Sequence, residues 1–320
     1  WEIMMIKVTD LAYGRLGAPD LDRMEEFLVD FGMVRADRTK NTLYMRGTDG
    51  DHHIHVTELG EPTLISLAWW AQSEEDLKAL TKADGASEIE AIDEPGGGKR
   101  VWLTDPDSRK IEIIHGMKTL APLEVRDVVI NTGKDKYNRS KIQRVPHRPS
   151  HVKRSAHAVV KTPDSKKTIE WYQSQLGFMT TDIVYADEDK NVDLLTFNHI
   201  DSGDSYVDHH VFLAVQAENS EFNHLSFEVA DFDDVHMGHD YMKLTGKYKH
   251  AWGVGRHMLG SQIFDYWRDP WGRIHEHWTD TDLVNNNHCP GRYATHEGLI
   301  NQWGPDFPLE FLDDPHVHAL

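Results

Sequence analysis

The chain has 320 residues, of which 39% are hydrophobic and 27% charged, and its formal net charge is -19. This length is sufficient for two globular domains, each with its own core, while the negative charge disfavours nucleic acid and anionic membranes as partners. The single cysteine, Cys289, excludes an intramolecular disulfide, and the N-terminal stretch lacks the apolar core of a signal peptide. We therefore expect a cytoplasmic protein with no nucleic-acid or membrane partner.

The first expected helix lies in the stretch from Asp10 to Met33. Pro19 precedes this helix and Gly32 follows it, as start and stop signals. Between them the apolar residues recur at helical spacing: Leu21, Met24, Phe27, Leu28 and Phe31. Because only one face of this helix is apolar, we expect it to pack on a sheet.

The same order of elements recurs later in the chain. A short strand, a Pro-Asp turn, an amphipathic helix and a glycine are found again in residues 154–179. The stretch 64–80 likewise corresponds to 222–238, and each is later followed by an aromatic strand, an Asp-Pro turn and a strand containing glutamate. The sequence thus reads as four similar units, arranged as two similar halves.

Two further segments complete the expected organisation. Residues 119–152 are polar and lack sustained periodicity, so we interpret them as a linker between an N-terminal domain, 5–118, and a C-terminal domain, 153–280. Residues 281–320 form an extension rich in Asn, His, Pro and Trp. We expect this extension to lie over the surface or over the mouth of a cleft.

Aligning the sequences of the two halves shows a difference in candidate metal-binding residues. At three equivalent positions the second half has His157, His224 and Glu276, whereas the first half has Tyr13, Ser66 and Glu112. Two imidazoles and one carboxylate are the facial triad of non-haem Fe(II) oxygenases, which leaves open positions for substrate and O2. With 21 histidines in the chain, one histidine alone would carry little weight. We predict a metal site in the second half and none in the first.

Three other patterns receive a structural interpretation. Strand alternation directs His275 and His277 away from Glu276, so we expect both to lie outside the metal cavity. The stretch DHHIH, residues 51–55, falls in the half without the triad and is expected to mark exposed turn and strand residues. The glycine run in DEPGGGKR, residues 93–100, lacks the phosphate-loop pattern and indicates a hairpin-type loop.

These residues resemble a known family. Over both domains the chain looks like a type I extradiol ring-cleavage dioxygenase of the vicinal oxygen chelate superfamily, similar to catechol 2,3-dioxygenases. The resemblance is carried by SAHAVVKTPD with His157, FNHLSFEVAD with His224 and YWRDPWGRIHEHW with Glu276. It implies that these three residues bind the metal.

The same family pattern supplies three candidate catalytic residues. Members have a histidine about fourteen residues before the second ligand, where VDHHVFLAV places His210. They also have a tyrosine upstream of the glutamate and a histidine upstream of that tyrosine, matched here by Tyr266 and by His257 in a glycine-rich loop. We interpret His210 as the acid–base residue and the other two as hydrogen-bonding partners of the substrate oxygens. Alternation would direct the adjacent His209 the other way.

The resemblance implies an α+β fold of two tandem domains, each built from two βαβββ units that form an open, cupped, barrel-like mixed sheet. It also implies extradiol (meta) cleavage of a catechol-type vicinal diphenol by O2, with Fe(II), or Mn(II) in its place, as cofactor. The product would be a ring-opened semialdehyde of the hydroxymuconic type, formed in aerobic aromatic catabolism. We expect a single-ring catechol as substrate and a homo-oligomeric enzyme.

Two departures and two alternatives accompany this interpretation. Trp271 stands where the family commonly has a small or polar residue, and the tail from His277 to Leu320 does not align, so both could reshape the pocket entrance. A glyoxalase-like isomerase of the same superfamily is one alternative, which would require a fourth protein ligand. A non-enzymatic aromatic-binding module is the other, and it would leave the three candidate catalytic residues without a role.

Overall fold

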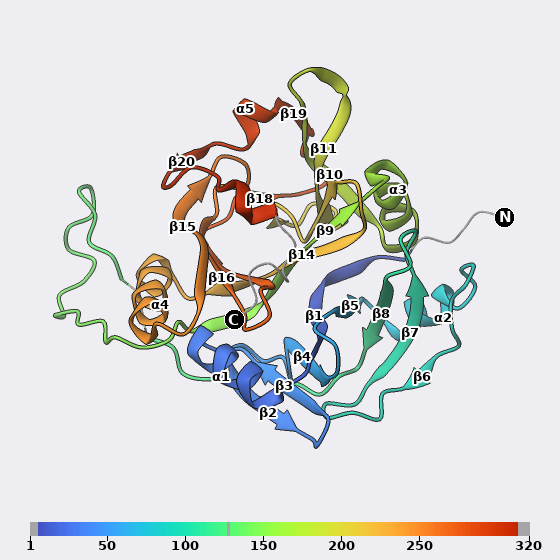
Figure 1. The fold of residues 1–320 in the computed structure, drawn as a ribbon, viewed down its shortest axis with the longest axis horizontal. Helices are drawn as coiled ribbons and strands as arrows, with labels where there is room; N and C mark the ends of the chain where they lie inside the picture. The colour runs from blue at the N-terminus through green and yellow to red at the C-terminus, as the bar shows by residue number, and fades with distance from the viewer. Residues whose placement is uncertain (1–5, 127–128, 313–320) are drawn as a thin grey trace.

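A computed structural model describes residues 6–126 and 129–312 of the chain. The described residues form two large mixed sheets, one of eight strands and one of ten, with helices packed against them (Figure 1). The predicted α+β class with two tandem domains is therefore confirmed.

The first sheet has the strand order β2-β3-β4-β1-β5-β8-β7-β6 and consists of two βαβββ units. The first unit contains β1 (Val8–Ala18), α1 (Leu21–Phe31), β2 (Val34–Arg38), β3 (Thr42–Arg46) and β4 (His55–Leu59). The second contains β5 (Leu64–Ala71), α2 (Glu74–Leu80), β6 (Glu90–Ala91), β7 (Lys99–Thr104) and β8 (Lys110–His115). The loop between β6 and β7 holds the glycine run, which confirms the hairpin interpretation.

The second sheet repeats this order and is extended by the tail of the chain. The third unit of the chain, which is the first of this sheet, contains β9 (Val152–Thr162), α3 (Ser165–Leu176), β10 (Phe178–Ala186), β11 (Asp189–Ile200) and β13 (Phe212–Gln216). The fourth contains β14 (Glu221–Val229), α4 (Phe232–Thr245), β15 (Lys249–His257), β16 (Ile263–Arg268) and β17 (Ile274–Thr279). The short β12 (Val207–Asp208) pairs with β18 (Leu283–Val284) in a separate ribbon.

Strands of the C-terminal extension form both edges of the second sheet. β19 (Gly291–Ala294) pairs in parallel with β10, and β20 (Asn301–Trp303) pairs with β15. Between them lies α5 (Thr295–Gly298), and the described part of the tail ends in the 3-10 turn η1 (Leu309–Leu312). The extension is therefore an integral part of the sheet as well as a surface covering.

The helix boundaries follow from the residues at their ends. Asp20 caps α1 by accepting hydrogen bonds from the backbone N–H groups of Asp22 and Arg23, and Gly32 ends the helix in the left-handed conformation, with φ of 115°. Asp164 and Gly177 perform the same two functions for α3. The aspartate of each Pro-Asp turn is thus the residue that starts the helix.

The two sheets share one apolar core, so the domains are packed face to face. From α1, Phe31 stacks on the His277 ring at a centroid distance of 3.6 Å. From α3, Tyr172 stacks on Phe212, whose ring also contacts Trp69 of the first sheet. The first helix of each domain therefore contributes to the interface.

The described residues between β8 and β9, 116–126 and 129–151, form neither helix nor strand. They make an excursion beside α4, visible in green in Figure 1. Arg126 forms an ion pair with Asp231 at 2.7 Å, and Gln143 donates to Asp233 at 2.7 Å, which ties this segment to the start of α4. Among all described residues, no helix combines the length and apolar character required to cross a membrane.

Candidate metal centre

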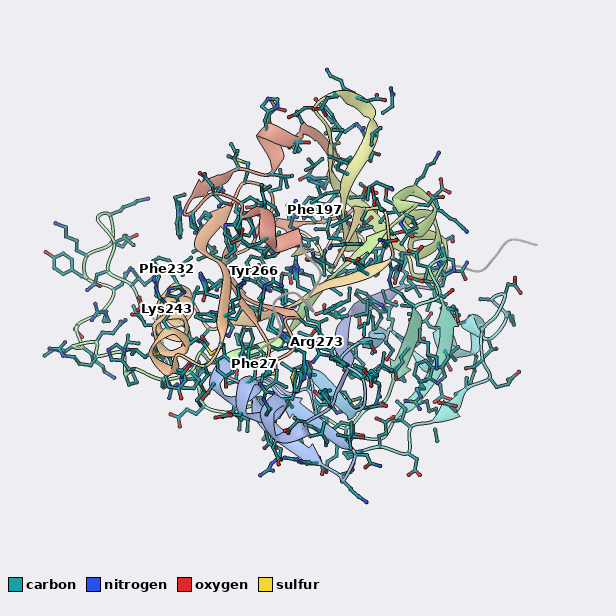
Figure 2. The ribbon with its side chains drawn as sticks, in the orientation of Figure 1. Phe27, Phe197, Phe232, Lys243, Tyr266 and Arg273 are labelled. Atoms are coloured by element: carbon teal, nitrogen blue, oxygen red, sulfur yellow. The ribbon has the colours of Figure 1, made fainter. Side chains whose placement is uncertain are left out.

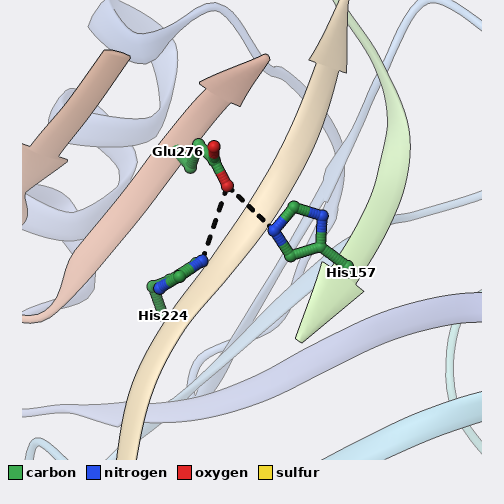
Figure 3. A group of neighbouring side chains, drawn as sticks. All are labelled: His157, His224 and Glu276. Atoms are coloured by element: carbon green, nitrogen blue, oxygen red, sulfur yellow. Dashed lines mark ion pairs between the residues drawn. The ribbon is translucent and has the colours of Figure 1, made fainter. Parts of the chain in front are cut away.

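Three neighbouring strands bring the predicted metal ligands together. His157 lies on β9, His224 on β14 and Glu276 on β17, and β14 is hydrogen-bonded to both of the other strands. Nε2 of His157 is 2.9 Å from Oε2 of Glu276, and Nε2 of His224 is 3.5 Å from the same oxygen (Figure 3). The three side chains thus meet at one point on one face of the sheet.

The ligand atoms of His157, His224 and Glu276 are better suited to binding a metal ion than to forming hydrogen bonds with one another. Although they lie close together, His224 Nε2 and both carboxylate oxygens of Glu276 are buried and have no hydrogen-bond partner. A buried carboxylate in this condition is costly unless a cation or a donor compensates it. Two imidazole nitrogens and one carboxylate oxygen are also ordinary ligands for Fe, Mn or Zn.

A second cluster provides a useful contrast. His239, His250 and Asp265 also bring ligand atoms close together. There, however, His239 Nδ1 and His250 Nε2 both form hydrogen bonds with Asp265 Oδ1, at 3.0 and 2.7 Å. Those groups already satisfy one another, so the triad of His157, His224 and Glu276 is the stronger metal candidate.

The local electrostatics favour the protonation states that metal binding requires. Burial alone would raise the pKa of Glu276, but His157 and His224 beside it hold that pKa well below its usual range. Burial lowers the pKa of His224. An ionised carboxylate and a neutral imidazole therefore face the same point.

The first sheet contains the same arrangement with different residues. Ala68 pairs with both Tyr13 and Glu112, as Ser226 pairs with both His157 and Glu276, which reproduces the alignment made from the sequence. The residues in these equivalent positions are thus related by the register of the two sheets.

In the first sheet, protein donors saturate the carboxylate of Glu112. It accepts hydrogen bonds from Tyr13 at 2.9 Å, from Ser66, from Arg15 at 3.0 Å and from Arg100 at 3.1 Å. The guanidinium groups supply the positive charge that a metal would supply in the second sheet. That the first half holds no metal stays a prediction, and these contacts give a physical reason for it.

A cavity of about 360 Å³ opens beside the triad. His210, His257 and Tyr266 all line it together with His157 and His224. Much of the remaining wall is apolar: Val159, Leu194, Leu195, Phe197, Leu213, Val215, Trp252, Leu259, Leu299, Phe307 and Phe311. Figure 2 labels two residues of this wall, Phe197 from β11 and Tyr266 from β16.

The three candidate catalytic residues differ in their contacts. His257 Nε2 is 2.9 Å from the Tyr266 hydroxyl and 3.8 Å from Oε1 of Glu276. Burial and the nearby Glu276 raise the pKa of Tyr266 well above its usual range, so its hydroxyl stays protonated. Burial, together with His157, holds the pKa of His210 well below its usual range. The cavity therefore presents the neutral ring of His210 and the protonated hydroxyl of Tyr266 next to the triad.

The tail of the chain closes this cavity. Leu299, Phe307 and Phe311 line it, and the Phe311 ring lies 5.0 Å from that of Tyr266. The expectation that the extension covers a cleft is thus met for the described residues. Residues 313–320 lie outside the described part of the chain.

Several sequence interpretations require correction. The DHHIH stretch is not exposed, because His52, His53 and His55 are 8%, 1% and 0% exposed. They are covered by the inner face of the first sheet and by the second domain, with His53 against Tyr13 and His55 against His275. The sequence interpretation considered the first half alone and therefore did not include neighbours from the second domain.

Trp271 does not shape the pocket entrance. The guanidinium carbons of Arg23 and Arg273 each lie 5.6 Å from the centre of its ring, and Trp271 is absent from the residues that line the cavity. His257 is the last residue of β15 and not part of an irregular loop.

His275 and His277 do lie opposite Glu276, as predicted from alternation. His275 Nε2 is 3.3 Å from His55 Nε2, and His277 Nε2 is 2.6 Å from the Phe31 carbonyl oxygen. Both histidines therefore belong to the interface between the domains.

The sequence analysis missed one contact of His210. Its Nδ1 lies 3.1 Å from Nδ1 of the adjacent His209, and His209 Nε2 lies 2.9 Å from Oδ2 of Asp182. Asp182 is distant in sequence, so only the pairing of β10 with its neighbours could bring it there.

Comparison with known proteins places this geometry in a family. A family model described as the Glyoxalase/Bleomycin resistance protein/Dioxygenase superfamily matches residues 154–274. Metapyrocatechase 2 from Cupriavidus necator is 30% identical over 313 residues, covering 93% of this chain and 89% of that protein. The chain belongs to the extradiol dioxygenases.

Two further matches to this extradiol dioxygenase cover nearly its whole length. The iron-dependent extradiol dioxygenase from Rhodococcus jostii (strain RHA1) is 25% identical over 322 residues, covering 95% of this chain and 99% of that protein. The crystal structure of the Mn(II)-bound glyoxalase from Novosphingobium aromaticivorans superposes with a TM-score of 0.79 at 22% identity, covering 98% of this chain and 96% of that chain. The predicted family and enzyme class are thereby confirmed, and the two-domain fold is shared.

Proposed function

We propose that this extradiol dioxygenase cleaves a neutral, single-ring catechol with O2, using Fe(II) held by His157, His224 and Glu276. The observation that carries this proposal is the convergence of His157, His224 and Glu276 on one point beside a small, largely apolar cavity, where His224 Nε2 and both carboxylate oxygens of Glu276 are left without hydrogen bonds. When bound, the ion would draw both catechol oxygens to itself and provide an electron path between the ring and O2. Mn(II) suits the same three ligands.

The surrounding side chains have separate tasks in this proposal. His210 takes the proton that the catechol loses on binding and returns it during ring opening. The Tyr266 hydroxyl, protonated and buried, donates to a catechol oxygen, and His257 forms a hydrogen bond with the other. The apolar walls exclude water, so these hydrogen bonds act in a medium of low dielectric constant.

The size and charge of the cavity favour a small uncharged substrate. Its volume of about 360 Å³ is near the lower end of the ~300–1,000 Å³ range of small-molecule pockets. The described residues that line it include no lysine and no arginine. A substrate carboxylate would therefore be buried without a cation, which is unfavourable. Catechol or a methylcatechol meets both conditions, and the product would be a hydroxymuconic-semialdehyde-type compound of aerobic aromatic breakdown.

The test is turnover on a panel of diphenols. The Fe(II)-loaded chain is mixed with catechol, the methylcatechols, 2,3-dihydroxybiphenyl and 3,4-dihydroxyphenylacetate, and O2 uptake and product spectra are recorded. We expect a yellow semialdehyde from catechol and methylcatechols, with kcat/KM at least about 100-fold lower for the carboxylated diphenol. Equal turnover of the carboxylated compound would contradict the substrate assignment.

One alternative is a glyoxalase-like isomerase, because a Mn(II)-bound glyoxalase shares the fold. At 22% identity that similarity concerns the fold alone. Among the described residues the cavity-facing metal group contains three ligands, whereas the isomerase would require a fourth. Turnover that proceeds without O2 would support the isomerase.

Assembly and location form the last part of the proposal. We expect a homo-oligomer in the cytoplasm, and the mass of the purified protein in solution tests the first of these points.

A further inference from the structure

A chain of three buried side chains lies behind the cavity. Asp182 comes from β10, and His209 and His210 lie between β12 and β13. Oδ2 of Asp182 is 2.9 Å from His209 Nε2, and His209 Nδ1 is 3.1 Å from His210 Nδ1. The three residues are 6%, 3% and 4% exposed, so protein surrounds each of them. Only His210 lines the cavity.

Counting protons along this chain fixes which nitrogen of His210 is free. Asp182 Oδ1 accepts a hydrogen bond from the Gly291 backbone N–H at 2.8 Å, and an ionised carboxylate can only accept at Oδ2 as well. The proton shared with His209 then lies on Nε2, and a neutral His209 has an acceptor at Nδ1. With His209 neutral and Asp182 ionised, His210 donates from Nδ1, whether its own ring is neutral or charged. The nitrogen left for chemistry is Nε2.

We propose that Asp182 and His209 are positioning residues that hold His210 with a proton on Nδ1, so that Nε2 exchanges the proton with the bound catechol. This inference rests on the proposed function, because it assigns the partners of the acid–base residue in that reaction. The same logic operates where a carboxylate orients a catalytic imidazole and selects its tautomer.

The contacts around His209 fix the position of its backbone and ring. The Thr181 hydroxyl donates to the His209 carbonyl at 2.7 Å, and the His209 N–H donates to the Asp282 carbonyl at 2.9 Å. Gly260 has φ of +79°, and a Cβ there would lie 3.2 Å from His209 Nδ1. A larger residue would therefore press on the ring at the nitrogen that faces His210.

The first domain supplies a matched comparison. His52 and His53 repeat the same contact, with their Nδ1 atoms 3.1 Å apart. Within the described part of the chain, however, His52 forms no ion pair with a carboxylate, in contrast to His209, and His53 lies against Tyr13 of the first sheet. The adjacent pair of histidines is common to both domains, whereas the Asp182 contact belongs to the domain with the candidate active site.

The direct test is the tautomer of His210. Histidine ¹⁵N NMR is recorded on the full chain loaded with diamagnetic Zn(II), without substrate, and His210→Gln assigns the signal. In the wild type we expect the proton on Nδ1. In Asp182→Asn, the amide can donate to His209 Nε2, which reverses both hydrogen bonds and moves the His210 proton to Nε2.

Kinetics on the Fe(II)-loaded chain provide the second readout. Asp182→Asn is expected to lower kcat about 100-fold or more, with KM within a few-fold and one metal per chain. Asp182→Glu, which retains an acceptor, should recover part of the loss. His209→Gln should resemble Asp182→Asn, whereas the matched variant His52→Gln should leave kcat unchanged.

The outcomes separate this inference from the proposed function. A wild-type His210 protonated on Nε2 overturns the inference even if catechol is cleaved, and so does an unchanged tautomer in Asp182→Asn. If Asp182→Asn fails to fold, the wild-type spectrum still decides. If the protein shows the expected tautomers but cleaves no diphenol, the positioning role of Asp182 and His209 is supported and the proposed reaction is refuted.

Discussion

The two domains provide a pair of glutamates in equivalent positions, and changing each to glutamine separates metal binding from fold stability. Glu276 faces the imidazoles of His157 and His224, and both of its carboxylate oxygens lack hydrogen bonds. Glu112 is saturated by protein donors that include Arg15, which is 3% exposed. The substitution retains the shape of either side chain and removes its charge.

The two substitutions are expected to change different quantities, the metal affinity in Glu276→Gln and the free energy of unfolding in Glu112→Gln. Altering an outer-shell partner of a metal ligand already costs about 10–100-fold in affinity, so removing the only anionic ligand in Glu276→Gln should weaken metal binding by more than about 100-fold, or about 2.7 kcal/mol. The free energy of unfolding of the metal-free chain should change little, because the substitution removes both the desolvation cost of the buried carboxylate and its attraction to His157 and His224. In Glu112→Gln the buried Arg15 loses one of its three carboxylate partners and keeps Glu58 and Glu94, so the free energy of unfolding should fall by less than the ~3–5 kcal/mol that breaking an isolated buried pair costs.

The assay combines metal titration with urea unfolding. The metal content of desalted protein is measured after anaerobic titration with Fe(II) or Mn(II), and unfolding is followed with a chelator present. We expect Glu276→Gln to lose metal but not stability, and Glu112→Gln to lose stability but retain one metal per chain. Metal affinity in Glu276→Gln within tenfold of wild type, or loss of the metal in Glu112→Gln instead, would refute the assignment of the two carboxylates.

Three further predictions concern the cavity and its surroundings. His210→Gln should lower kcat by about 10²–10⁴-fold at unchanged metal content, because acid–base catalysis is worth this much, and a kcat within tenfold of wild type would exclude that role. Phe311→Ala removes a ring from the cavity wall, so kcat/KM for 2,3-dihydroxybiphenyl relative to catechol should rise about tenfold; an unchanged ratio would show that this ring does not limit substrate size. Burial lowers the pKa of His199 from 6.5 to about 4, so this residue's contribution is fully present above pH 6.5 and is lost as pH falls toward 4. His199→Gln should therefore reduce the pH dependence of the unfolding free energy by up to about 1.4 kcal/mol per pH unit between pH 6 and 5, and identical slopes in wild type and variant would contradict this reasoning.

Features that depend on local chemistry could be predicted from the sequence. The ends of α1 were predicted from Pro19 and Gly32, and in the structure the helix begins after the adjacent Asp20 and ends at Gly32, because such signals act within a few residues. The candidate triad could be identified because the chain contains its own reference, a second half with tyrosine and serine in place of the histidines. The direction of His275 and His277 followed from the two-residue period of a strand.

Features that depend on distant partners could not be predicted in this way. Asp182 reaches His209 only because β10 and the segment after β12 become neighbours in the folded chain, and nothing in either stretch specifies the other. The burial of His55 arises from the second domain, which a reading of one half leaves out. β19 and β20 are four and three residues long, too short to show a period, and are strands because free sheet edges receive them.

The most direct test of the central claim is the fate of both oxygen atoms of O2. The Fe(II)-loaded wild type and Glu276→Gln are given catechol under ¹⁸O2, and O2 uptake, product spectrum and product mass are measured together. We predict one O2 consumed per catechol, a ring-opened semialdehyde containing label from both atoms when exchange is quenched, and no product from the variant. Metal-loaded wild type that consumes no O2 with any diphenol, or a variant that cleaves catechol at the wild-type rate, would contradict a metal-dependent ring-cleavage site built on these three side chains.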